Sequence, residues 1–293
     1  MIPSYEKRQI SPDWRQRLAP PTVWEFQNYS GWKSSILYLL NDVIDEDVRA
    51  KFLDEPPEYI VGDNLDWLDG IIEAVHGCKS DIGELLVNRL RTHYRAFRAT
   101  HGTRTADLAS FYEKGLLPLD PNRIHDELRS RFLNGRFRDV GEAQLEAAME
   151  DMGDVDGGGR EGRLYFEANQ DFLIQFCAHY MIHGSEYLHC LAIRLGNPDR
   201  FRAELRKEGK PVVFVCDVPM AFISSRSLRD FAGTTLEYIF KDFFFDGDFE
   251  PEPYQGAGFS ILQPLCPQAI VGHFFPAKMR DPHRGGIVTD GFS

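Results

Sequence analysis

The sequence has 293 residues, of which 43% are hydrophobic, and it carries 45 acidic against 33 basic residues, a formal net charge of -12. This composition is typical of a folded globular protein and lacks the signature of disorder. An excess of acid argues against an extended nucleic-acid surface, which requires clustered Lys and Arg. A local basic patch stays open, because residues 89–104 hold five arginines and no acid.

The cysteines and the N-terminal residues indicate the cellular compartment in which the protein is expected. Five scattered cysteines without a CxxC pair predict neither a disulfide framework nor a zinc knuckle, and they favour the reducing cytoplasm. Residues 1–18 lack the apolar stretch of a secretory signal, and no apolar run approaches the roughly 18 residues of a spanning helix. We therefore expect a cytoplasmic protein without a membrane-spanning segment.

The first third of the chain is expected to be mainly helical. Residues 1–34 are rich in proline and aromatic residues and predict an irregular arm. Apolar residues then recur at helical spacing, which predicts one amphipathic helix from Ser35 up to the prolines at 56 and 57. A second helical stretch covers residues 64–97 and breaks at Gly77. Residues 1–92 are thus taken as a mainly helical N-terminal region.

Beyond residue 92 the pattern alternates irregularly between strands and helices. The predicted strands are 95–104, 162–169, 210–219, 258–265 and 268–275, and the predicted helices are 105–114, two within 121–152 separated near Gly135, 170–196 and 227–244. Residues 153–162 are rich in Gly and Asp and predict a loop. Strands spaced unevenly among helices favour an α+β fold over a regular doubly wound sheet.

Two short motifs follow one another in residues 93–293. His101-Gly102-Thr103-Arg104 is followed by a short helix and Gly115-Leu116, and Gly162-Arg163-Leu164-Tyr165-Phe166 comes later, before a helix that carries aromatic residues. Together they resemble the catalytic domain of the poly(ADP-ribose) polymerases, which has a His-Gly-Ser/Thr-Arg strand, a Gly-Leu turn and a Gly-x-Tyr-Phe strand. The resemblance implies an ADP-ribosyltransferase-like split β-sheet core over residues 93–293.

The resemblance also implies NAD as a substrate. In that family the His binds the adenine-side ribose, the adjacent Gly bonds the nicotinamide carboxamide through its backbone, and an aromatic residue stacks on the nicotinamide ring. Carried over, the ring would stack on Phe176 or Tyr180. The implied NAD-binding residues are His101, Gly102, Thr103, Arg104, Tyr165, Phe176 and Tyr180.

Cleavage of the nicotinamide bond passes through a positively charged ribose, so a carboxylate is also needed. The family places a Glu at the start of a late strand, but residues 254–260 contain no acid. Glu186, Glu237 and Glu252 are the substitutes to consider. If the helix over 170–196 breaks at Gly184, Ser185 can cap a new helix whose dipole favours an ionised Glu186, so Glu186 is our candidate catalytic residue.

The implied function is an NAD-dependent ADP-ribosyltransferase, or an NAD glycohydrolase, that acts on a macromolecular acceptor as a toxin or defence factor. The missing late-strand Glu leaves an alternative: an inactive member of the fold that binds a nucleotide-like ligand or a protein partner. A third hypothesis is a metal-dependent hydrolase. His179, His183 and Glu186 at i, i+4 and i+7 would share one face of a continuous helix, although satisfied core residues are the simpler interpretation.

Overall fold

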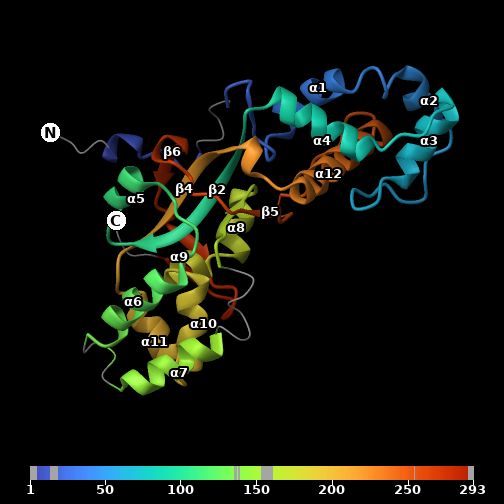
Figure 1. Ribbon diagram of the computed structural model, residues 1–293. Coiled ribbons are helices and arrows are strands. Elements are labelled where there is room, and N and C mark those ends of the chain that lie inside the picture. Colours follow the sequence, from blue (N-terminus) through green and yellow to red (C-terminus); the bar gives the residue numbers. More distant parts are fainter. Residues whose placement is uncertain are drawn as a thin grey trace. The chain divides into compact units, whose positions relative to one another are not determined.

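The computed structural model describes residues 5–13, 19–134, 137, 139–152, 161–253 and 255–289. Contacts within the chain divide it into two units, and Figure 1 labels most of their helices and several of their strands. Unit 1 comprises Met1–Gln16, Ala99–Asp217 and Gly258–Ser293, and unit 2 comprises Arg17–Arg98 and Val218–Ala257. This division differs from the expected boundary at residue 92, because the helical unit also takes in a segment from the second half of the chain.

Unit 2 is mainly helical. Its elements are β1 (Val23–Trp24), α1 (Tyr29–Leu39), α2 (Glu46–Asp54), α3 (Asp66–His76), α4 (Ile82–His93), the 3-10 turn η4 (Met220–Phe222) and α12 (Ser225–Phe244). Helix α4 packs against α12, and the Trp24 ring meets Phe97 and Phe231 edge-on in the core, with centroids 5.1 and 6.2 Å away. This core joins the two sequence segments of the unit.

The single helix predicted from Ser35 to the prolines at 56 and 57 is wrong in extent. Helix α1 begins earlier, at Tyr29, and α2 is a separate helix. The reason lies at Asp45, whose carboxylate accepts a hydrogen bond from the Val48 amide at 3.0 Å and so starts a new helix inside the apolar pattern. Strand β1 lies within residues 1–34, the segment expected to be an irregular arm, and it pairs with Ala96 and Phe97.

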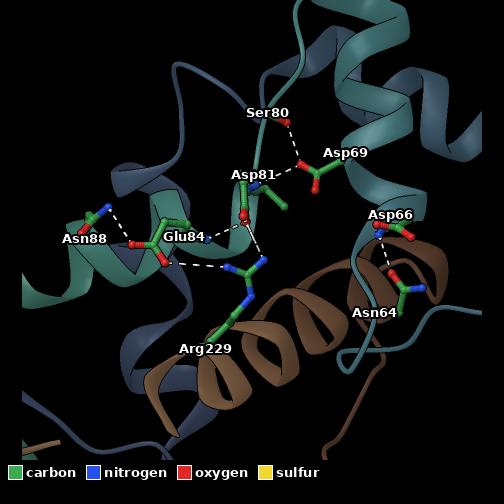
Figure 2. Close-up of polar contacts among 9 residues, drawn as sticks. Asn64, Asp66, Asp69, Ser80, Asp81, Glu84, Asn88 and Arg229 are labelled. Carbon is green, nitrogen blue, oxygen red and sulfur yellow. Dashed lines mark hydrogen bonds and ion pairs between the residues drawn. The ribbon is translucent and has the colours of Figure 1, made fainter. Parts of the chain in front are cut away.

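Side chains at helix ends tie α3, α4 and α12 together (Figure 2). Asp81 caps α4 by accepting from the Glu84 amide at 2.9 Å, and the same carboxylate accepts from the Arg229 guanidinium of α12 at 2.8 Å. The Glu84 amide and then Arg229 hold the pKa of Asp81 below its usual value. Asp69 of α3 accepts from the Ile82 amide at 2.9 Å. The residues at the start of α4 therefore connect α4 to both α3 and α12.

Unit 1 combines a sheet with a group of short helices. Its elements are η1 (Glu6–Arg8), α5 (Ala109–Lys114), α6 (Pro121–Phe132), α7 (Glu142–Met152), β3 (Leu164–Glu167), α8 (Gln170–Phe176), α9 (His179–His183), α10 (Glu186–Arg194), α11 (Pro198–Leu205), β5 (Gly258–Ile261), η5 (Pro267–Ala269), β6 (Ile270–Phe274), β7 (Lys278–Arg280) and β8 (Ile287–Thr289). Helix α10 packs against α7, α9 and α11. Strands β2 (Ala96–Thr105) and β4 (Lys210–Pro219) carry the chain from one unit to the other.

The main sheet has the order β5-β3-β2-β4-β6, with β1 beside β2, and β7 and β8 form a separate hairpin. Strand pairs β2–β3, β3–β5 and β4–β6 are antiparallel. An α+β fold with an antiparallel sheet is therefore confirmed, and β4 has the bounds that the sequence predicts. The finer expectation of an ADP-ribosyltransferase-like split sheet stays a prediction.

The long helix predicted over 170–196 is in fact three helices, α8, α9 and α10. The chain does break at Gly184, one of the two possibilities that a glycine inside this helix pattern leaves open, the other being close packing. This residue has φ +107°, a conformation that favours glycine. Ser185 then caps α10, its hydroxyl accepting from the Leu188 amide at 3.1 Å. Most of the loop predicted over 153–162, and the helix boundary expected near Gly135, lie outside the described residues.

Candidate functional site

The two predicted motifs lie on neighbouring strands of unit 1. His101 lies in β2 and Tyr165 in β3, and the His101 ring donates from Nδ1 to the main-chain carbonyl of Tyr165 over 2.9 Å. A carbonyl can only accept, so the proton of the neutral ring is on Nδ1 and its Nε2 is a lone-pair acceptor. Burial lowers the pKa of His101, with the Tyr165 carbonyl acting weakly in the opposite direction. The site thus presents a neutral imidazole.

Gly102 faces two helices of the same unit. A Cβ at this position would lie 3.1 Å from Cγ of Met181 in α9 and 3.3 Å from Cδ2 of Leu173 in α8. Both contacts are tighter than most side chains make. Glycine therefore lets α8 and α9 pack closely on β2, next to His101.

Thr103 and Arg104 fasten the end of β2 to the helices. The Thr103 hydroxyl donates to the Gly184 carbonyl at 3.1 Å. The Arg104 guanidinium donates to the main-chain carbonyls of Glu208, at 2.7 Å, and of Arg206 and Met181. Arg104 lies in β2, within the predicted strand, and its hydrogen bonds position the chain.

The predicted aromatic residues differ in their surroundings. Tyr165 is 45% exposed and Phe176 is 40% exposed. Phe176 ends α8, stacks on Phe172 at 5.1 Å between centroids, and has the Arg280 guanidinium 5.8 Å over its ring. Tyr180 instead packs on the His179 ring, with centroids 4.1 Å apart. Phe176 is thus the more accessible of the two predicted stacking rings.

Glu186 is the first residue of α10. One of its carboxylate oxygens pairs with Nε2 of His179, and the other accepts from the Cys190 thiol at 3.6 Å. Because Thr103 contacts Gly184, two residues earlier, the end of β2 lies beside the turn that starts the Glu186 helix. Among the candidate acids, Glu186 is the one that the described contacts connect to the His101 strand.

The other two candidate acids belong to unit 2. Glu237 in α12 accepts from the Gly62 amide at 2.8 Å and from Lys241 at 2.6 Å, contacts that hold a loop on the helix. Glu252 follows α12 in the same unit.

A cluster of four histidines was not predicted as a group. His179 of α9 and His189 of α10 meet His283 from the turn between β7 and β8, and His183 of α9 meets His189. The closest rings are His189 and His283, 4.2 Å apart and nearly parallel. The density of histidine in 179–189 was visible in the sequence. The fourth ring comes from about a hundred residues away, and only the fold brings it there.

The metal hypothesis required His179, His183 and Glu186 on one continuous helix, and the break at Gly184 separates them. Within the described parts of the chain, no group of three or more His, Cys, Asp or Glu side chains is arranged to hold a metal ion. None of the helices described here combines the length and apolar character needed to cross a bilayer. Comparisons with protein-family models, with curated proteins and with solved structures find no match.

Proposed function

We propose that the protein binds NAD beside the His101 end of β2 in unit 1 and transfers its ADP-ribose to a macromolecular acceptor or to water. The observation that carries this proposal is the hydrogen bond from His101 to the Tyr165 carbonyl. It brings together two motifs that are about sixty residues apart in the sequence and that each resemble an NAD-binding strand.

The state of His101 suits a ribose. A neutral ring with its proton on Nδ1 offers Nε2 as an acceptor for a hydroxyl group. The lowered pKa keeps the ring neutral at ordinary pH, so it does not repel the positive charge that develops on the reacting ribose. Phe176, with 40% of its surface exposed, offers a ring on which the nicotinamide can stack.

In the proposed reaction, the bond between ribose C1 and the nicotinamide nitrogen breaks, and nicotinamide leaves with the electron pair. The nucleophile of the acceptor, or water, then bonds to C1 and loses its proton. Glu186 is the carboxylate proposed to stabilise the positive ribose, since it begins α10, where the helix dipole favours a negative charge, and lies beside the end of β2.

The test is a calorimetric titration of the full chain with NAD, followed by an assay for free nicotinamide. Binding followed by release supports transferase or glycohydrolase activity. Binding without release, repeated with protein extracts as acceptor, would favour the alternative of an inactive binding protein. No binding between pH 5 and 8 would refute the proposal.

A further inference from the structure

The β7–β8 hairpin spans the helices of unit 1. Arg280 of β7 lies over the Phe176 ring of α8, and His283 in the turn stacks on His189 of α10. Arg284 pairs with Asp199 of α11. The hairpin therefore contacts α8, α10 and α11, and His283 also meets His179 of α9. Its Arg280 lies over one face of an aromatic ring.

The turn of the hairpin is fixed from within. The carboxylate of Asp281 accepts from the amides of His283, at 2.9 Å, and Arg284, at 3.3 Å, and the Asp281 amide donates to the Gly286 carbonyl at 2.8 Å. These bonds hold the backbone of the turn that carries His283. The hairpin thus meets the helices through a turn that its own hydrogen bonds stabilise.

The histidines beneath the tip are deeply buried. His183 is 3% exposed and His189 1%. Arg202 of α11 donates to Nε2 of His189 at 3.0 Å, so the neutral His189 ring carries its proton on Nδ1. That N–H is buried, as is Nδ1 of His183, and neither atom has a hydrogen-bond partner among the described residues. Burying such a group without a partner costs free energy. Opening of the hairpin would recover part of that cost by exposing the group to water.

Both signs of charge surround these two rings. Around them lie His179 of α9, Arg202 of α11, Arg206 directly after α11, and Asp281 and His283 of the hairpin tip. Glu186 of α10 pairs with His179. A proton on His189 would face the Arg202 guanidinium and the His283 ring. A proton on His183 would be attracted by Asp281 but repelled by both arginines.

We propose that the β7–β8 hairpin is an acid-released strap over the histidine cluster and over Phe176. In its closed position Arg280 occupies the face of Phe176. If the proposed function holds, this is the face on which the nicotinamide ring stacks, so release of the strap regulates access to that site.

The sign of the pH dependence follows from the two buried rings. Burial lowers the pKa of His183 to about 4, despite Asp281, and burial followed by Arg202 lowers the pKa of His189 to about 3. A hydrated imidazole has a pKa of about 6.5, so opening takes up protons below that pH. Between pH 7.5 and 5 the open fraction should rise by up to roughly thirtyfold for each ring that becomes hydrated.

Hydrogen exchange measured by mass spectrometry on the full chain tests the strap directly. Exchange of amides in 278–289, corrected for the chemical rate at each pH, should accelerate at least tenfold between pH 7.5 and 5. Amides of α12 in unit 2 serve as the internal reference and should keep their protection. Equal behaviour of the hairpin and α12, or a hairpin that is insensitive to pH, would overturn the proposal.

Two variants separate release by protons from general loosening. His189→Gln keeps an acceptor for Arg202 but cannot take up a proton, so the pH dependence of hairpin exchange should flatten. His283→Ala removes the stack at the exposed surface, so the hairpin should already exchange faster at pH 7.5. His93→Ala, an exposed histidine of unit 2, is the control and should change neither. If His189→Gln does not fold, an unchanged hairpin in His283→Ala still refutes the strap.

The functional consequence has its own readout. Arg280→Gln should uncover Phe176 and tighten NAD binding at pH 7.5 about threefold or more, while wild-type affinity should rise as the pH falls to 5. If the hairpin opens at low pH but NAD does not bind, the proposed function is wrong and the strap proposal is unaffected. NAD binding that is indifferent to Arg280 and to pH would reject the regulation.

Discussion

The hydroxyl of Thr103 donates a hydrogen bond to the main-chain carbonyl of Gly184 at 3.1 Å. Together with the contacts of Arg104, this hydrogen bond holds the end of β2, which carries His101, at the turn from which the Glu186 helix begins. The segment predicted to bind the ribose is therefore hydrogen-bonded, within unit 1, to the turn that precedes the proposed carboxylate.

Replacement of Thr103 by valine keeps the shape of the side chain and removes that bond. We expect a loss of about 1 kcal/mol in the free energy of unfolding, since a partly buried carbonyl loses its donor. Thr92→Val is the matched control: its hydroxyl donates to the Asn88 carbonyl at an exposed position of α4, where water replaces the bond. Urea unfolding of both variants measures the difference, and equal losses would contradict the role given to Thr103.

Glu186→Gln tests the proposed carboxylate. It removes the negative charge but keeps the size of the side chain, so NAD affinity should stay within about threefold while nicotinamide release falls by roughly a hundredfold. Glu237→Gln in unit 2 should leave release unchanged. Wild-type turnover in Glu186→Gln would remove this residue from the reaction.

Gly184→Ala should destabilise unit 1. The residue has φ +107°, and a Cβ would lie 2.9 Å from Cδ1 of Leu188, so we expect a loss of about 1–3 kcal/mol. Gly70→Ala provides a contrast, because Gly70 lies inside α3 and a Cβ there meets nothing within 4 Å. That variant should gain about 0.5–1 kcal/mol. A gain in both would show that the turn at Gly184 is not strained.

Stability against pH should differ between the units. Burial lowers the pKa of His183, His189 and His273 to about 4, 3 and 4, so unit 1 keeps its full stability above pH 6.5 and loses it as the pH falls. Each histidine removes up to about 2 kcal/mol by pH 5. Hydrogen exchange of β4 and β6 should follow this loss.

The tryptophans provide the control for that experiment. Three of the four, Trp24, Trp32 and Trp67, lie in unit 2, so fluorescence reports chiefly on that unit. The unfolding midpoint seen by fluorescence should move little between pH 7 and 5. A parallel decline of both signals would contradict an origin in the buried histidines of unit 1.

Local patterns predicted much of the fold. The apolar run of β4 and the helical periodicity of α12 are each long enough to determine one element, and both were predicted closely. Short helices were harder, because the cap at Asp45 competes with an unbroken apolar pattern. The junction after α8 at Cys177 has no glycine or proline to mark it in the sequence.

Part of the candidate site could likewise be predicted from local sequence patterns. A motif such as His101-Gly102 can be recognised within a few residues, whereas the stack of His283 on His189 depends on the return of a distant hairpin. The role of Arg104 could not be predicted either. Its acceptors are main-chain carbonyls of residues about a hundred positions away, and every residue has such a carbonyl. Contacts of these kinds follow from the fold and not from local pattern.

The most direct test of the central claim is the affinity of His101→Asn for NAD. Asparagine can place an N–H where Nδ1 donates to the Tyr165 carbonyl, so β2 and β3 stay tied, but it has no acceptor in place of Nε2. Calorimetry should show NAD binding at least tenfold weaker than wild type, with wild-type affinity in His93→Asn. Unchanged affinity in His101→Asn would contradict the placement of NAD at the end of β2.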